Sequence, residues 1–195
     1  MLDILIKNGY VITMNEDGSA YSNGDVAIED GEIVEVGKEI EEDADTVVDA
    51  EGKAVMPGLI NAHTHLAMVL LRGIADDMEL QSWLEEKIWP MEANLEAKHV
   101  QNGALLGCLE MIKSGTTCFM DQYFFMDEVT KAVEESGLRA TLCYGIIEEN
   151  DPEKREEELE TAMDLIEKHD GTAEGRIKTM LGPHSTYTCS PECLD

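Results

Sequence analysis

Two histidines, His63 and His65, stand two positions apart where an apolar run ends. The run is interrupted by Pro57-Gly58 and is typical of a short buried strand. Side chains of a strand alternate between its faces, so positions i and i+2 project on the same side. Two imidazoles there offer two nitrogen ligands to one divalent ion such as Zn²⁺, whose catalytic sites combine three protein ligands with water. A bare pair of this kind is also typical of surface or hydrogen-bonded core histidines, but strand ends are where α/β barrels carry their chemistry.

The other residues with reactive side chains give weaker signals by themselves. Glu92 follows Trp89-Pro90, where an exposed acid is the ordinary interpretation. His184 follows Gly182-Pro183 at a strand end, where a metal ligand, a substrate contact and a structural histidine are all open interpretations. His99 and His169 stand in polar surroundings and are predicted to face solvent. Arg155 lies within an acidic run, which favours a surface ion pair over binding of a substrate carboxylate.

Residues 1–54, which precede this stretch, are predicted to form short strands separated by turns. The Asp30-Gly31 dipeptide, between two runs rich in β-branched residues, is the strongest hairpin signal. Further strands are expected over residues 4–11 and 46–50. The segment is too short to bury a β-sandwich alone.

Residues 55–195 change to alternating strands and helices, which is typical of parallel βαβ units. Strands are predicted at the start of this region and at 116–120, 138–147 and 177–181, and helices at 80–89, 95–113, 127–136 and 152–169. The first of these helices is expected to end at Pro90. Four strand-and-helix units are half of a (β/α)8 barrel, which needs eight strands and about 250 residues. We therefore expect the N-terminal half of a longer enzyme.

The composition narrows the class of protein further. The chain has 42 acidic and 14 basic residues and a formal net charge of −28, which disfavours nucleic acid and anionic membranes as partners. Such an excess also favours a halophilic source. No apolar run is long enough to span a membrane, and no signal peptide is recognised, so a cytoplasmic protein is expected. The five cysteines form no CxxC pair and are expected to be reduced and mostly buried.

Several stretches in combination resemble one family. The run from Pro57 to His65 is similar to the first-strand motif of the amidohydrolase superfamily, metal-dependent hydrolases and deaminases on a (β/α)8 barrel. The stretches 70–73, 76–77, 83–86, 88–92, 110–117 and 182–184 resemble the deaminases of adenosine-type nucleosides, which act on 5′-deoxyadenosine, S-adenosylhomocysteine and methylthioadenosine. The stretches 106–110 and 121–127 are most similar to archaeal 5′-deoxyadenosine deaminases. Ser185-Thr186-Tyr187 departs from the Ala-Pro-Tyr common in the family, which puts the loop in doubt but not the preceding histidine.

The resemblance implies a role for each candidate. His63 and His65 match the first two ligands of one divalent metal ion, expected to be Zn²⁺. Glu92 matches the carboxylate that binds the ribose hydroxyls, and His184 matches a histidine that contacts substrate. The residues that move protons and complete the metal site have no match in this chain and are expected beyond Asp195. Residues 1–54 match one part of a β-sandwich that strands from the C-terminus complete, and residues 55–195 match the first four βα units of the barrel.

The implied reaction is hydrolytic deamination of an adenosine-type nucleoside to its inosine-type product and ammonia. The expected partner is a small-molecule nucleoside, and the full-length enzyme is expected to form homo-oligomers. Guanine deaminases, chlorohydrolases and cyclic-amide hydrolases share the His-x-His strand, but Glu92 in its Trp-Pro setting favours a substrate that contains ribose. The alternative outside these enzymes is an inactive half-barrel that binds metal only weakly.

Overall fold

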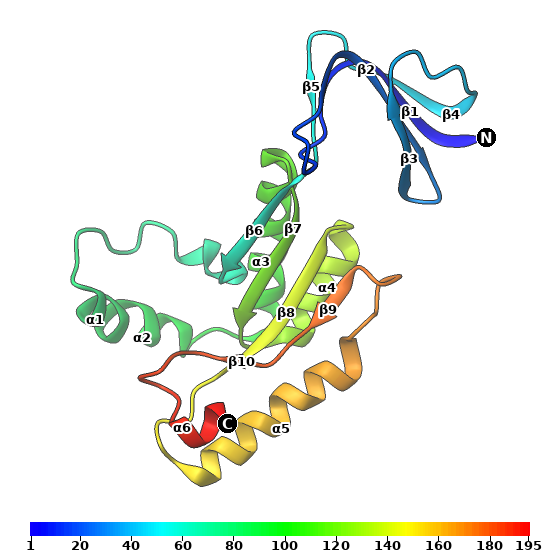
Figure 1. The fold of residues 1–195 in the computed structure, drawn as a ribbon. Coiled ribbons are helices and arrows are strands. Elements are labelled where there is room, and N and C mark those ends of the chain that lie inside the picture. The colour runs from blue at the N-terminus through cyan, green and yellow to red at the C-terminus, as the bar shows by residue number, and fades with distance from the viewer. The chain divides into compact units, whose positions relative to one another are not determined.

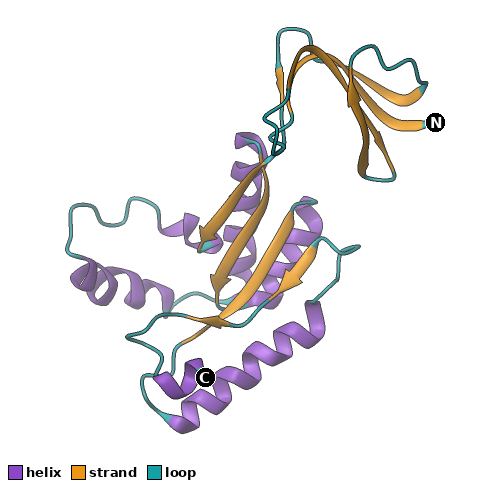
Figure 2. Ribbon diagram, viewed as in Figure 1, coloured by secondary structure: helices purple, strands orange, loops and turns teal.

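A computed structural model describes all of residues 1–195. The chain divides into two compact units, Met1–Gly58 and Leu59–Asp195. The division therefore falls at Gly58, whereas the sequence pattern placed it after residue 54. Figures 1 and 2 show strands alone in the first unit and alternating strands and helices in the second.

The first unit is one five-stranded sheet. Its strands are β1 (Leu2–Ile12), β2 (Ala20–Glu29), β3 (Glu32–Gly37), β4 (Ala44–Asp49) and β5 (Ala54–Val55). The order is β3-β2-β1-β4, with β5 also paired to β1. The turn between β2 and β3 is the predicted Asp30-Gly31 hairpin, and both residues have positive φ, of 53° and 75°. Positive φ at both central residues matches the twist of the strands that the turn joins.

The apolar core of the first unit is small. It is made by Leu2, Leu5, Ala27 and Ile40. Ile33, Val34 and Val47 remain exposed on other parts of the strands. One sheet of this kind is not a sandwich, so the β-sandwich stays a prediction.

The second unit is built on parallel strands. They are β6 (Leu59–Thr64), β7 (Thr116–Tyr123), β8 (Arg139–Ile146), β9 (Ile177–Thr179) and β10 (Gly182–Pro183). β6 pairs with β7 and β7 with β8, while β9 and β10 both pair with β8. The predicted strand 177–181 is shorter than expected and ends at Thr179, and the second short strand β10 lies just beyond the predicted range. At Gly182 a Cβ atom would lie 2.7 Å from the Tyr144 carbonyl oxygen, so only glycine lets β10 approach β8 this closely.

Helices connect these strands, as expected. They are the 3₁₀-helix η1 (Leu66–Leu71), α1 (Leu80–Trp83), the π-helical turn η2 (Leu84–Ile88), α2 (Trp89–Glu92), α3 (Ala97–Ser114), α4 (Met126–Ser136), α5 (Pro152–His169) and α6 (Pro191–Leu194). The prediction that a helix ends at Pro90 is wrong, because the chain stays helical to Glu92. The wider π-helical turn before Pro90, in which the Trp89 N–H donates to the Leu84 carbonyl, accommodates the proline ring.

One continuous core joins the helices α3, α4 and α5 to the strands β7, β8 and β9. Phe119 on β7 and Leu142 on β8 are almost completely buried in it. The start of η1 packs against α3 at Gly107, where a Cβ atom would lie 2.4 Å from Leu66 Cδ1. A larger residue at Gly107 would push away Leu66, the residue that follows His65.

Three side chains outside the expected site have partners that the sequence did not reveal. His99 accepts a hydrogen bond from the Glu96 N–H at the start of α3. His169 lies 2.7 Å from Asp127 and is 20% exposed, so it faces solvent only in part and is paired. Arg155 lies 3.6 Å from Glu148, whose side chain is fully buried, rather than in a pair within its own acidic run.

The cysteines agree with the expectation from composition. All five cysteines are free thiols, and Cys108, Cys143 and Cys189 are buried. None of the helices combines the length and apolar composition that crossing a bilayer requires.

Candidate functional site

His63 and His65 meet at the carboxyl end of β6, as their spacing predicts. The two imidazole rings lie edge to face with their centroids 5.2 Å apart. His63 belongs to the strand and is exposed, whereas His65 follows it directly and is half-buried. The end of β6 lies beside the end of β7, because Thr64 pairs with Asp121 across the two strands.

His65 is held in one tautomer by the neighbouring strand. Its Nδ1 lies 2.7 Å from the backbone carbonyl oxygen of Gln122. A carbonyl oxygen only accepts hydrogen bonds, so Nδ1 carries the proton and donates it. In the neutral ring this leaves the Nε2 lone pair free. A second-shell bond of this kind orients histidines that bind metals.

Asp121 fixes the backbone that follows His65. Its Oδ1 accepts a hydrogen bond of 2.7 Å from the Leu66 N–H, and its Oδ2 has no partner within the chain. The side chain is fully buried, and burial raises the pKa of the Asp121 carboxyl to about 7. The one bond it makes anchors η1 to β7 and so restricts the place where His65 leaves its strand.

Glu92 reaches the same region from α2. Its Oε1 accepts a hydrogen bond of 2.7 Å from the Tyr123 hydroxyl, and the Tyr123 ring centroid lies 6.4 Å from that of His65. Burial raises the pKa of Glu92, whereas the Tyr123 bond and the charge of His65 oppose this rise. Burial and the bond to Glu92 together raise the pKa of Tyr123 strongly, so its hydroxyl keeps its proton and donates.

His184 is carried to this edge by β10. Its backbone N–H donates to the Ile146 carbonyl at 3.1 Å, and its Nδ1 lies 3.0 Å from the Thr188 hydroxyl. The Gln122 side-chain amide donates to the Gly182 carbonyl at 2.8 Å, so one residue contacts both His65 and the segment before His184. Burial, followed by the charge of His65, lowers the pKa of His184 and favours its neutral ring. The four residues singled out in the sequence thus converge on the ends of the parallel strands.

The model of the amidohydrolase family matches residues 54–195. This chain belongs to the amidohydrolase family. The resemblance noted in the sequence is confirmed, and the second unit is the parallel half-barrel sheet that this family's α/β barrel predicts.

Individual amidohydrolases and deaminases match over nearly the whole chain. A 5′-deoxyadenosine deaminase of Methanosarcina acetivorans is 57% identical over 194 residues, which are 100% of this chain and 45% of the relative. A 5-methylthioadenosine/S-adenosylhomocysteine deaminase of Thermococcus sibiricus is 49% identical over 193 residues, 99% of this chain and 45% of the relative. The crystal structure of an adenosine deaminase from Xanthomonas campestris with bound zinc matches with a TM-score of 0.89 and 32% identity, over 98% of this chain and 45% of that one. The chain spans less than half the length of these relatives.

The residues of this amidohydrolase chain fit a metal site in part. His63 and His65 are adjacent nitrogen donors, and the bond from His65 Nδ1 to Gln122 leaves the other ring nitrogen available. No group of three or more His, Cys, Asp or Glu side chains within residues 1–195 is arranged to hold a metal ion. Catalytic zinc sites use three protein ligands. The two histidines are therefore suited to supply part of a ligand set.

Sequence reasoning missed the residues that hold the site together. Asp121, Gln122 and Tyr123 are consecutive at the end of β7, and each contacts a different part of the site. The sequence pattern predicted this strand over 116–120, but the strand continues to Tyr123. The signal that could have found them is their place at the carboxyl end of a parallel strand beside β6.

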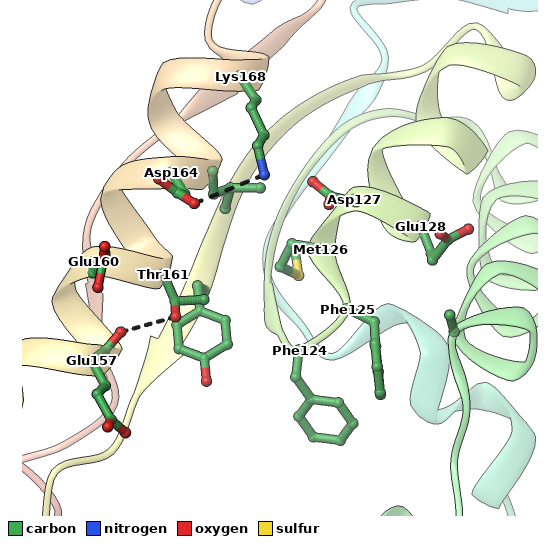
Figure 3. A pocket seen from close by; sticks show the side chains of 13 residues that line it. Phe124, Phe125, Met126, Asp127, Glu128, Glu157, Glu160, Thr161, Asp164 and Lys168 are labelled. Carbon is green, nitrogen blue, oxygen red and sulfur yellow. Dashed lines mark hydrogen bonds and ion pairs between the residues drawn. The ribbon is translucent and has the colours of Figure 1, made fainter. Parts of the chain in front are cut away.

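A groove separate from these contacts lies between α4 and α5. It has a volume of about 650 Å³ and none of the four expected site residues lines it. Figure 3 shows Phe124 and Phe125 on one side and the acidic face of α5 on the other. Its charges are largely paired within the chain, since Asp164 lies 3.9 Å from Lys168, Glu128 2.6 Å from Lys131 and Asp127 2.7 Å from His169.

Proposed function

We propose that residues 1–195 carry the metal-binding and ribose-binding part of a hydrolytic deaminase of adenosine-type nucleosides. The substrate is 5′-deoxyadenosine, S-adenosylhomocysteine, methylthioadenosine or adenosine, and the products are the inosine-type nucleoside and ammonia. The observation that carries this proposal is the Glu92 carboxylate, bonded to Tyr123 beside the His65 ring. The relatives named as deaminases, which match the whole chain, support it.

Each residue then has a definite task. His63 and His65 would hold one divalent ion, with Zn²⁺ the expected metal because imidazole suits it. The chemistry that this ion supplies when bound is activation of water for attack on the ring carbon that bears the amino group. Glu92 accepts hydrogen bonds from the vicinal ribose hydroxyls, as an ionised carboxylate can. His184 contacts the nucleoside, and no residue of this chain is assigned the proton transfer.

The Glu92 carboxylate distinguishes adenosine-type nucleosides from the other substrates considered for this family. Guanine and chlorinated triazines have no ribose, so they give Glu92 no hydroxyl partner. A half-buried carboxylate without such a partner would lose part of its hydration with no hydrogen bond from the substrate to compensate. The charge of −28 also supports a small-molecule partner over nucleic acid.

Ammonia release from the nucleosides and guanine, together with chloride release from a chlorotriazine, tests this proposal. The protein expressed from the full open reading frame that encodes this chain is loaded with Zn²⁺ and supplied with the four nucleosides, with guanine and with a chlorotriazine. We expect turnover of nucleosides and none of the two compounds without ribose. Equal or faster turnover of guanine or the triazine would contradict the proposal.

The same assay on residues 1–195 alone shows whether this chain has activity without the rest of the open reading frame. Since this chain holds no cluster of three metal-binding side chains, we expect no metal-dependent ammonia release from it, in low or in multimolar salt. Metal-dependent turnover by residues 1–195 that disappears in His63→Ala would show that this chain contains a complete site.

A further inference from the structure

Glu92 lies on a segment that has little packing of its own. The helices α1 and α2 bury no residues, and Ile88 in the turn between them is the one side chain of residues 76–94 that is fully buried. Figure 1 shows α1 and α2 beyond the edge of the strands β6 and β7. Packing alone therefore restricts the position of Glu92 only weakly.

One side-chain bond ties this segment to the sheet. The Tyr123 hydroxyl donates to Glu92 Oε1 at 2.7 Å, across 31 positions of sequence. The other side-chain bonds of residues 76–94, from Gln81 to Glu85 and from Asn94 to the Pro90 carbonyl, stay within the segment. No ion pair joins the segment to the rest of the chain.

Tyr123 is itself firmly held. It pairs with Tyr144 in the ladder between β7 and β8, it is 6% exposed, and its ring stacks on Phe124 with the centroids 4.0 Å apart. The same strand holds His65 through the Gln122 carbonyl. A bond from Tyr123 therefore ties Glu92 to the strand that orients His65.

We propose that Tyr123 is a positioning residue that aims the Glu92 carboxylate and thereby sets the selectivity for nucleosides with two vicinal hydroxyls. Two carboxylate oxygens offer about four acceptor positions. Tyr123 occupies one on Oε1 and fixes the plane of the group, so that the remaining positions face the ribose. This inference rests on the proposed function, because it takes the ribose as the partner of Glu92.

The test compares two substrates that differ only in these hydroxyls, 5′-deoxyadenosine and 2′,3′,5′-trideoxyadenosine. The ratio of their kcat/KM values is measured for the full open reading frame as wild type, Tyr123→Phe, Glu92→Gln and the double variant. Phenylalanine keeps the buried ring and removes only the hydroxyl. Tyr10→Phe is the control, since Tyr10 is 49% exposed on β1 of the first unit. A thermal unfolding curve for each variant checks that it is folded.

We expect Tyr123→Phe to lower the selectivity ratio roughly tenfold, the size of effect that loss of one hydrogen bond to a charged group gives. The loss should fall on 5′-deoxyadenosine, mainly as a higher KM, while the trideoxy compound is turned over at the wild-type rate. Tyr10→Phe should keep the wild-type ratio. In the Glu92→Gln background Tyr123→Phe should lower the ratio no further, because the bonded carboxylate is already gone.

Other results overturn the inference in distinguishable ways. If Glu92→Gln abolishes the selectivity and Tyr123→Phe retains it, the proposed function stands and the role of Tyr123 is wrong. If Tyr123→Phe lowers kcat/KM equally for both substrates, Tyr123 supports the fold and does not orient Glu92. That result also refutes the positioning role of Tyr123. If the wild type turns over neither nucleoside or does not distinguish them, the proposed function fails and this inference fails with it.

Discussion

The strand side and the helix side of the site are held in different ways. His63 and His65 stand at the end of β6, and His184 follows β10, so backbone bonds of a parallel sheet set their positions. Glu92 stands at the end of an irregular helical stretch in which one residue is fully buried and one side-chain bond reaches the sheet. The difference shows that the end of a paired strand positions a side chain precisely by itself. A side chain on a connecting segment needs a specific side-chain contact to be positioned as precisely.

This contrast has an energetic consequence. A backbone ladder distributes its constraint over many hydrogen bonds, so removing one side chain leaves the strand in place. A single side-chain hydrogen bond carries the whole constraint, so its loss changes the orientation of the group that it holds. Substitutions of the strand-end histidines should therefore remove a chemical group and leave the strands in place. Loss of the contact that holds α2 should instead change the orientation of the Glu92 carboxylate.

The largest effect is expected on the strand side. The double variant His63→Ala, His65→Ala removes both nitrogen donors and should lose bound metal together with all detectable turnover. Elemental analysis and ammonia release on the full open reading frame measure both. His99→Ala is the matched control, because that histidine caps α3 away from the site. Full metal occupancy in the double variant would contradict the assignment.

A smaller effect is expected on the helix side. Glu92→Gln keeps the shape of the side chain but removes its charge, so binding of the ribose hydroxyls should weaken by about 1.5–3 kcal/mol, or roughly 10- to 150-fold in kcat/KM. Metal content should stay at the wild-type level. Equal activity of the variant and the wild type on 5′-deoxyadenosine would show that Glu92 has another role.

His184→Ala should reduce turnover with metal retained. A neutral hydrogen bond contributes about 0.5–1.5 kcal/mol, which corresponds to a loss of roughly 2- to 12-fold. The ring of His184 is favoured in its neutral form by burial, so such a bond is the one it can offer. Loss of the metal in this variant would identify His184 as a ligand and would place it with the histidines of β6.

The last prediction concerns the local stability of the two sides in the unmutated protein. Backbone amides of residues 76–94 should exchange with solvent at least about a hundredfold faster than those of β7, because few buried contacts oppose local opening of the segment. Hydrogen exchange read by mass spectrometry on the full open reading frame resolves these segments. Equal protection of both would mean that Glu92 is held by packing as firmly as the histidines are.

Local features of this protein follow from the sequence. The Asp30-Gly31 turn, the helix Pro152–His169 and the two helices that end just before Gly115 and Gly137 were all predicted. Each depends on the conformational preference of one or two residues: positive φ at the glycines, and at Asp151 a side chain that accepts the Glu153 and Lys154 N–H groups. The spacing of His63 and His65 belongs to the same class, because strand geometry alone brings i and i+2 together.

Contacts between distant positions were decided by the tertiary structure. His65 meets Gln122 across 57 positions and Glu92 meets Tyr123 across 31, and no local pattern indicates which residue of β7 faces which partner. The pairing of His169 with Asp127 and the continuation of the helix through Pro90 are further cases. Preferences of single residues act over one or two turns of chain, whereas the register between β6 and β7 and the packing of η1 on α3 set these distances. The sequence by itself therefore determined which groups could do chemistry, and the tertiary structure determined which side chains hold them, because those bonds exist only once the strands are paired.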